Sequence, residues 1–475
     1  MRMARVKLVE GTPGVLSRTL PFWVEPAHVF SLLRDRPGAV LLESQPGAVG
    51  GRYSIICVEP FGIMRTADGQ TSLSLPAATS ENSDSPFDTL RNVLSACAVP
   101  CSAEVTFAGG AVGYLGYELR TFTEDSLISA PDDLGLPDCW VGFYNHAAVF
   151  DHGNRTISLN GCALPGAPDP GPGLAALAEL IVQTQAGEDD RFAGFADVGE
   201  HAPSSGFTKA GYCAAVGHVK DYIAAGDVYQ VNLSQRFAVP IEMDAWDVYL
   251  RLRKRNPAPY AAYLNLGDFC IVSSSPECFL RYDPGTRLVE TSPIKGTRPR
   301  SADPAEDERL ASELTLSEKD MAENVMIVDL ERNDLGRVCE FGSVGVPELA
   351  AVESHPTVHH LVSTVVGRLR HDCDSVDLLT ACFPGGSITG APKIRAMEII
   401  DEIEPVRRGV YTGSIGCLGF DGSVNLNIVI RTAVVKDGTC FLHVGGGIVA
   451  DSDPELEYQE TLDKARAFFE VLGCR

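Results

Sequence analysis

The sequence predicts an α+β protein built on antiparallel β-sheets. Helical and β-like runs follow one another irregularly, without the strand–helix–strand repeat that builds a parallel sheet. Asp421-Gly422 and Asp437-Gly438 separate β-like runs, and such dipeptides are typical of hairpins between antiparallel strands. The chain has 475 residues, 45% hydrophobic and 21% charged, so it can bury a large core and form two or three domain-sized units.

Composition limits the partners of this chain. The net charge of -24 argues against sequence-independent binding of nucleic acid, but it leaves room for a local basic pocket that holds a small anion. No run has the apolar length of a membrane helix, and the basic residues 1–5 are not followed by the apolar segment of a signal peptide. The fourteen cysteines form no C-x-x-C pair, which favours reduced core residues of a cytoplasmic protein.

Three regions follow one another along the chain. Residues 15–163 alternate short β-like runs with turns, for example at 40–42 and 52–56. Residues 164–207 are predicted to be a linker that contains a Pro/Gly run, a helix over 173–184, and a polar stretch that is exposed and mobile from 186. Residues 208–472 are more regular, and we expect them to intertwine with the N-terminal region into one compact unit.

Periodicity and capping residues predict the elements of the third region in order. Strands are expected at 228–237, 261–266, 269–272, 279–282, 288–290, 411–419, 424–434 and 439–444. Helices are expected at 209–225, ended by Gly226, at 318–329, capped by Ser317, and at 376–383, 393–402 and 454–472. The last helix has Asp453 as its cap and Pro454 at its first position.

Lys295 lies in a proline-rich basic segment, residues 292–300. Prolines on both sides of Lys-Gly-Thr predict a fixed bend rather than a helix. Arg298 and Arg300 follow without an acid between them, and cationic neighbours disfavour the charged form of a lysine and favour a nucleophilic amine. A solvated basic loop is the alternative for this segment taken alone.

Carboxylates recur on two of the predicted helices. Glu323 lies in the helix over 318–329, where a surface carboxylate is the simpler interpretation. Glu457, Glu460 and Lys464 fall at i, i+3 and i+7 of the last helix and therefore share one face. Clustered carboxylates suit Mg²⁺, and a solvated acidic face near a helix N-terminus is the alternative.

Glycine, arginine and histidine supply further candidates. Gly445-Gly446-Gly447 precedes the last helix, and consecutive glycines allow backbone N–H groups to approach an anion; a flexible turn is the alternative. Arg431, placed at the end of a strand over 425–430, is suited to clamp a carboxylate. His359 and His360 are adjacent on a strand and point in opposite directions, so they are not expected to bind one metal ion.

Taken together, these motifs resemble the chorismate-utilising enzymes and, among them, the aminodeoxychorismate synthase branch. The resemblance is dense over 207–472 and weaker over 18–160, and it is carried by the segments 226–237, 275–277, 293–300, 319–337, 359–363, 384–393 and 445–464. It implies an anthranilate-synthase-like fold, in which antiparallel sheets pack as a sandwich with helices outside, and a chorismate-binding catalytic region over 208–472.

The resemblance also implies roles for individual residues. It implies Mg²⁺ ligands at Glu323 and Glu460, with Glu457 close by, and a clamp on the enolpyruvyl carboxylate of chorismate from Arg431, Tyr411 and the backbone of Gly446 and Gly447. It places His360 near the C4 hydroxyl group, and pocket-lining positions at Ser387, Gly390, Lys464 and Gln230.

Two positions indicate the branch. Isochorismate and salicylate synthases have a water-activating lysine where this chain has Gln230, and a glutamine amide cannot act as a general base. Anthranilate synthases have alanine at the position of Lys295, whereas the aminodeoxychorismate branch has lysine. Asn232 and Asn324 also resemble that branch.

The reaction implied is an amination of chorismate through a covalent intermediate. Lys295 attacks C2, Glu277 protonates the departing C4 hydroxyl with help from His360, and ammonia then attacks C4 and expels the lysine. The product is 4-amino-4-deoxychorismate, a precursor of p-aminobenzoate and folate. The alternatives are component I of anthranilate synthase, in tryptophan biosynthesis, and a non-catalytic paralogue that senses chorismate or tryptophan.

Two further partners are implied. The chain contains no recognisable Cys–His–Glu amidotransferase unit, so a separate glutamine amidotransferase subunit is expected to supply ammonia within a heterodimer. Ser44, Pro259 and Ala261 resemble a tryptophan pocket that is regulatory in anthranilate synthases. Ala261 replaces a larger residue there, so feedback control by tryptophan is not expected.

Overall fold

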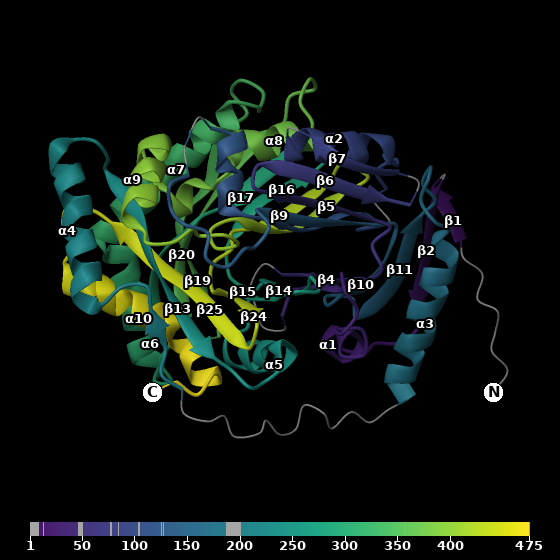
Figure 1. Ribbon diagram of the computed structural model, residues 1–475, viewed down its shortest axis with the longest axis horizontal. Helices are drawn as coiled ribbons and strands as arrows, with labels where there is room; N and C mark the ends of the chain where they lie inside the picture. Colours follow the sequence, from purple (N-terminus) through teal and green to yellow (C-terminus); the bar gives the residue numbers. More distant parts are fainter. Residues whose placement is uncertain are drawn as a thin grey trace.

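Two antiparallel β-sheets pack face to face in the computed structural model, and helices cover their outer sides (Figure 1). The structure describes residues 9–12, 14–45, 51–76, 78–83, 85–102, 105–124, 126, 128–186, 201–356 and 358–474. The predicted α+β class, with antiparallel sheets packed as a sandwich and helices outside, is confirmed.

The first sheet has thirteen strands within the described residues. Their order is β1 (Val9–Thr12), β2 (Val15–Leu20), β11 (Thr156–Cys162), β10 (His146–Asp151), β4 (Tyr53–Cys57), β3 (Val40–Glu43), β14 (Tyr260–Asn265), β15 (Cys270–Ser275), β24 (Thr432–Lys436), β25 (Thr439–Ile448), β13 (Gln230–Pro240) and β12 (Ser204–Ser205), with β21 (Gly390–Ala391) also paired to β13. Strands within residues 15–163 therefore continue directly into strands within residues 208–472, through the β3–β14 pair.

The second sheet has twelve strands in the same described ranges. Their order is β18 (Ile294–Pro299), β20 (Val358–Arg368), β17 (Leu288–Ser292), β16 (Cys278–Asp283), β23 (Val424–Asn427), β22 (Ser414–Gly419), β8 (Gly110–Leu115), β9 (Cys139–Tyr144), β5 (Gly62–Ala67), β6 (Gln70–Leu75) and β7 (Ala78–Ser83), with β19 (Gly345–Ser354) also paired to β20. Here the two regions meet at the β8–β22 pair.

Helices cover the outer face of each sheet. Against the first sheet lie α1 (Pro26–Phe30), α3 (Pro170–Ala186), α5 (Ala245–Arg255) and α10 (Pro454–Val471), and against the end formed by β13 lie α4 (Lys209–Ala225) and α9 (Lys393–Ile403). Against the second sheet lie α2 (Pro86–Ala96), α6 (Pro304–Leu316), α7 (Glu318–Gly336) and α8 (Ser375–Cys382). The 3₁₀ helices η1 (Tyr117–Phe122) and η3 (Gly386–Ile388) lie in the connections.

Separate hydrophobic cores join these layers. One core lies between the two sheets and includes Ile55 and Leu264 of the first sheet with Trp140 and Ile415 of the second. Other cores lie between the first sheet and α1, α3, α5 and α10, and between the second sheet and α2, α7 and α8. Burial of alternating strand residues on both faces explains why many strands are apolar throughout.

The structure corrects three local expectations. Lys295 lies in strand β18, which pairs with β20, rather than in a turn. The predicted strand over 424–434 is two strands, β23 and β24, which belong to different sheets. The three glycines 445–447 lie inside β25, paired with β13, rather than in a turn.

The predicted linker contains helix α3, which begins earlier than expected and spans Pro170–Ala186. Most of the stretch predicted to be mobile, residues 187–200, lies outside the described residues. Among the helices that the structure describes, none is long and apolar enough to cross a membrane.

Candidate active site

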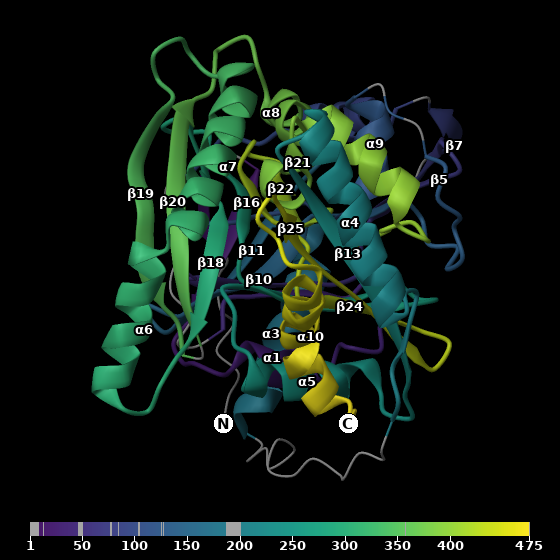
Figure 2. The ribbon, with the colours of Figure 1, turned by 90° about the vertical axis from the view of Figure 1, so that its left-hand side faces the viewer.

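The candidate site lies where β13 and β25 of the first sheet approach β18 and β20 of the second. Figure 2 shows β25 and α10 beside β13, with β18, β20 and α7 alongside them. Most of the residues that were predicted to act on chorismate or a metal belong to these elements. The others lie on further segments: Glu277 between β15 and β16, Ser387 in η3, Gly390 in β21, Tyr411 before β22, and Arg431 between β23 and β24.

Lys295 is buried and paired with an acid. Its Nζ lies 2.9 Å from Glu323 Oε1 and donates to the carbonyl oxygen of Ser387, also at 2.9 Å. Arg298 and Arg300 turn away and pair with carboxylates of α6 and α7. The expectation of cationic surroundings for Lys295 is therefore wrong, because residues close in sequence alternate sides along a strand.

Glu277 lies between β15 and β16 and is only 3% exposed. Burial raises the pKa of its carboxyl group to about 7, although the positive charge of Lys295 acts in the opposite direction. Its Oε1 has no hydrogen-bond partner among the described residues, and neither do the side-chain oxygens of Gln230 and Ser387. Buried polar atoms normally find partners, so this group of three is prepared to bind a polar ligand.

His360 is a buried residue of β20. Its Nδ1 forms a hydrogen bond of 2.9 Å with Thr297 Oγ1, which lies opposite it on β18. Burial, with His355 and Arg431 nearby, lowers the pKa of the His360 imidazole to about 3, so the ring is neutral near pH 7. His359 points away and bonds with Asp307, which confirms the opposite orientation of the two rings.

Three carboxylates converge on the glycines of β25. A Cβ atom added to Gly446 would lie 3.2 Å from Glu460 Oε1 and 3.5 Å from Glu457 Oε2, and a Cβ atom on Gly447 would lie 2.8 Å from Glu323 Oε1. The structure therefore brings the three predicted metal ligands to one glycine pair. In the part of the chain described, however, no three His, Cys, Asp or Glu side chains form a ready-made metal site.

Polar contacts join the walls of the site. Gln230 Nε2 donates to Glu323 Oε1 at 2.6 Å, and Lys464 Nζ donates to the Gly445 carbonyl at 2.8 Å. Gly390 lies in β21, which pairs with the edge of β13 opposite to β25, and a Cβ atom added there would lie 2.2 Å from the carbonyl oxygen of Gln230. This close approach excludes a side chain at position 390, and the φ of 145° is unfavourable for residues other than glycine.

Arg431 lies in the break between β23 and β24, with a φ of 50°. Burial lowers the pKa of its guanidinium group, and among the described residues it forms no ion pair. Tyr411 lies just before β22 and stacks on His443, with ring centroids 5.1 Å apart and an interplanar angle of 11°. A half-buried arginine that forms no ion pair among the described residues is suited to hold a ligand carboxylate.

A buried ion pair that the sequence did not reveal supports these segments. Arg408 and Glu404 pair at 2.7 Å, with side chains 2% and 4% exposed. Arg408 also donates to the carbonyl oxygens of Asn232 and Ile388, and Ser234 donates to Glu404. The pair therefore ties β13 to η3, which carries Ser387. Glu404, Arg407 and Arg408 are charged residues close together in the sequence, a pattern typical of an exposed turn. Only the tertiary structure shows that Glu404 and Arg408 are buried.

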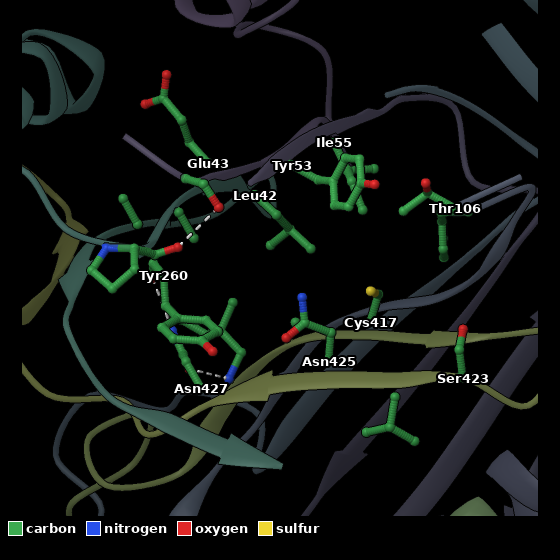
Figure 3. Close-up of a pocket in the computed structure, with 18 residues that line it drawn as sticks. Leu42, Glu43, Tyr53, Ile55, Thr106, Tyr260, Cys417, Ser423, Asn425 and Asn427 are labelled. Carbon is green, nitrogen blue, oxygen red and sulfur yellow. Dashed lines mark hydrogen bonds between the residues drawn. The ribbon is translucent and has the colours of Figure 1, made fainter. Parts of the chain in front are cut away.

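A second cavity lies between the two sheets, separate from this site (Figure 3). It has an empty volume of about 720 Å³, its open mouth included, and Ser44, Pro259 and Ala261 all line it. Ser44 Oγ donates to the Pro259 carbonyl at 3.2 Å. In Figure 3, Leu42 lies across the cavity from Asn425. The three residues predicted for a tryptophan site thus share one pocket.

The chain is similar to known proteins in both sequence and fold. A family model described as chorismate binding enzyme matches residues 38–470. The chain belongs to the chorismate-binding enzymes.

Other members of the family cover almost the whole chain. Aminodeoxychorismate synthase component 1 of Escherichia coli (strain K12) is 42% identical over 93% of this chain and 95% of its own length. Anthranilate synthase component 1 of Pseudomonas aeruginosa is 40% identical, with 96% and 94% coverage. The crystal structure of anthranilate synthase component I from Streptococcus pneumoniae TIGR4 has a TM-score of 0.78 at 33% identity, covering 89% of this chain and 93% of that one.

Gly447→Ala is expected to lower the activity of this chorismate-binding enzyme at least about a hundredfold while leaving it folded. The added Cβ atom would lie 2.2 Å from Gln230 Nε2 and 2.8 Å from Glu323 Oε1, so both side chains must move. Steady-state kinetics and a thermal unfolding midpoint check the two parts. Gly217→Ala on α4 is the control, because its Cβ atom meets nothing within 4 Å. Full activity of Gly447→Ala would contradict the assignment of this site.

Proposed function

We propose that this enzyme aminates chorismate at C4 and forms 4-amino-4-deoxychorismate, a precursor of p-aminobenzoate and folate. The observation that carries the proposal is the position of Lys295, whose amine lies in the carboxylate–glycine site with Glu277 buried nearby. The relatives named aminodeoxychorismate synthase component 1 support it.

In the proposed mechanism, Lys295 and Glu277 act as nucleophile and general acid. The amine of Lys295 attacks C2 of chorismate, the ring double bonds shift, and the C4 hydroxyl leaves as water with a proton from Glu277. A carboxyl group with a pKa of about 7 still holds a proton near neutral pH, as this step requires. Ammonia then forms the C4–N bond, the C2–N bond to Lys295 breaks, and the enolpyruvyl group is retained.

The other side chains hold the substrate. A neutral His360 has its Nδ1 engaged by Thr297, which leaves Nε2 to bond with the C4 hydroxyl. Arg431 and Tyr411 hold the enolpyruvyl carboxylate, and the N–H of Gly447 assists them. Gln230, Ser387, Gly390 and Lys464 line the pocket.

Magnesium fits the donor set of this site. Glu323, Glu460 and Glu457 offer hard oxygen donors around Gly446 and Gly447, and Mg²⁺ usually takes one or two carboxylates with water and substrate oxygens. When bound, the ion would supply positive charge for the ring carboxylate of chorismate. The glutamates of this chain would hold the ion and fix the position of that carboxylate.

A partner supplies the ammonia in this proposal. The relatives are named component 1, which supports the existence of a second component. We propose that it is a glutamine amidotransferase that forms a heterodimer with this chain. The cavity between the sheets, lined by Ser44, Pro259 and Ala261, is the proposed tryptophan site.

The test is the identity of the product. The purified protein is incubated with chorismate, Mg²⁺ and ammonium, and the products are separated and identified by mass spectrometry. We expect 4-amino-4-deoxychorismate without release of pyruvate. Formation of anthranilate with pyruvate would overturn the proposal.

Anthranilate synthesis is the second candidate, because relatives with that name are 40% identical and one shares the fold. The same assay decides between the two activities. A non-catalytic paralogue would bind chorismate without turnover, even with saturating ammonium and Mg²⁺.

The pH profile tests the role of Glu277. If its protonated form is required, Glu277 should contribute a factor to kcat/KM per free ammonia that is constant below pH 7 and falls about tenfold per pH unit above it, because the pKa is about 7. Glu277→Gln should lose about 10²–10⁴-fold in rate and also lose this decline. The control is Glu348→Gln, an exposed residue of β19. A decline that persists in Glu277→Gln would assign it to another group.

A further inference from the structure

Each of the three glutamates proposed to bind Mg²⁺ is paired with a different lysine. Glu323 Oε1 lies 2.9 Å from Lys295 Nζ, and Glu460 Oε1 lies 2.6 Å from Lys464 Nζ. Glu457 Oε1 lies 3.4 Å from the Nζ of Lys319. The lysines come from three elements, β18, α10 and α7, so their common position results from the tertiary structure and not from one local motif.

These three ion pairs form one cluster with equal numbers of acidic and basic side chains, rather than three independent contacts. All three carboxylates approach the backbone of Gly446 and Gly447. A Cβ atom added to Gly446 would lie 3.6 Å from Lys464 Nζ, 3.2 Å from Glu460 Oε1 and 3.5 Å from Glu457 Oε2, so one point of the backbone is within 4 Å of groups from two of the pairs. Three positive and three negative charges are therefore close enough to influence one another, and the cluster is neutral overall.

A divalent cation cannot join this cluster without changing it. Mg²⁺ binds carboxylate oxygens at about 2.0–2.1 Å, and a divalent and a monovalent cation about 5 Å apart repel each other by more than RT even at the dielectric constant of water. The lysine ammonium group is a point charge on a flexible stem, so it can leave its carboxylate without movement of the backbone. When the cation binds, the lysine ammonium groups are therefore the groups that move away from the carboxylates.

We propose that Lys295, Lys464 and Lys319 are resident counter-ions which a divalent cation must displace, so that cation binding and separation of Lys295 from Glu323 are one coupled event. This inference rests on the proposed function, in which Lys295 must be free to attack chorismate. Binding of the metal ion would then have two effects: it would hold the substrate, and it would separate the amine of Lys295 from the carboxylate of Glu323. Coupling of this kind is reciprocal, so removal of a lysine must strengthen cation binding.

The test measures cation binding directly, in the absence of chorismate and ammonia. Mn²⁺ is titrated into the full chain and free Mn²⁺ is followed by its electron paramagnetic resonance signal, with Mg²⁺ as a competitor. Lys319→Met, Lys464→Met and Lys295→Met are each expected to bind Mn²⁺ about tenfold tighter than the wild type. Lys319 has a half-exposed side chain, so its variant keeps the fold even where the others are less stable.

The matched control is Lys209→Met. Lys209 also pairs with a glutamate of α10, Glu455, but neither residue belongs to the cluster. Its replacement should leave the Mn²⁺ affinity within about twofold of the wild type.

Unchanged or weaker binding in Lys319→Met and Lys464→Met would overturn the proposal, as would equal tightening in Lys209→Met or no Mn²⁺ binding by any variant. The titration contains no substrate, so its outcome does not depend on which product the enzyme forms. The product assay can therefore contradict the proposed function while the Mn²⁺ titration supports the coupling. Equally, the titration can contradict the coupling while the product assay supports the proposed function.

Discussion

Lys295→Ala is expected to lower the rate of 4-amino-4-deoxychorismate formation by about 10²–10⁴-fold, because it removes the proposed nucleophile. Wild-type protein incubated with chorismate and Mg²⁺ without ammonia should gain mass from a covalent adduct, and the variant should not. Intact-mass spectrometry and steady-state kinetics check the two parts. The residue is buried beside Glu323, so the thermal midpoint of each variant is measured as well.

Lys295→Arg is the matched control for the ion pair. A guanidinium group preserves the charge next to Glu323 but is not nucleophilic at neutral pH. If the lysine acts only as a counter-ion, Lys295→Arg should retain most of the activity. An adduct that still forms in Lys295→Ala would exclude the covalent role of this residue.

Arg408→Met is expected to have the largest effect on stability among the changes considered. The substitution leaves Glu404 buried and charged, with Ser234 as its remaining side-chain donor. Breaking such a pair from one side costs about 3–5 kcal/mol of the free energy of unfolding. Denaturant unfolding of the wild type and the variant measures this difference. Because the pair joins β13 to η3, the variant should also bind chorismate more weakly.

The double variant Arg408→Met/Glu404→Gln tests the cause of that loss. It leaves no unpaired buried charge, so it should be more stable than Arg408→Met alone. Arg309→Met removes an exposed arginine that pairs with Glu306 and Glu313 on α6, and it should leave unfolding unchanged. If the free energy of unfolding of Arg408→Met were as unchanged as that of Arg309→Met, the Arg408–Glu404 pair would not stabilise the site.

Elements with strong local signals were predictable from the sequence. Helix α4 spans Lys209–Ala225 as predicted and ends at Gly226, which adopts the left-handed conformation with a φ of 84°. Helix α10 begins at Pro454, and Asp453 accepts two backbone hydrogen bonds there. In both helices the capping residues satisfy end groups within a few residues, so local chemistry determines the boundary. Helix α7 continues to Gly336, beyond the predicted end at 329, because its later turns pack against the second sheet.

Strand positions near the site were less predictable. Lys295 and the glycines 445–447 have sequences typical of turns, yet both are held in strands by partners far away in the chain. The break before Arg431 occurs because β23 and β24 belong to different sheets. Pairing between distant segments stabilises these conformations, and no local pattern contains that information.

The sequence by itself determined the α+β class, the family resemblance and the identity of the chemically competent residues, because these depend on residue types in ordered motifs. The tertiary structure alone decided how those residues are paired. It placed Lys295 against Glu323 rather than among cations, and it brought Lys319 and Lys464 to the neighbouring carboxylates. It also buried Arg408 with Glu404. The physical reason is that electrostatic interactions depend on distance in space, and residues from separate elements become neighbours only when the two sheets pack together.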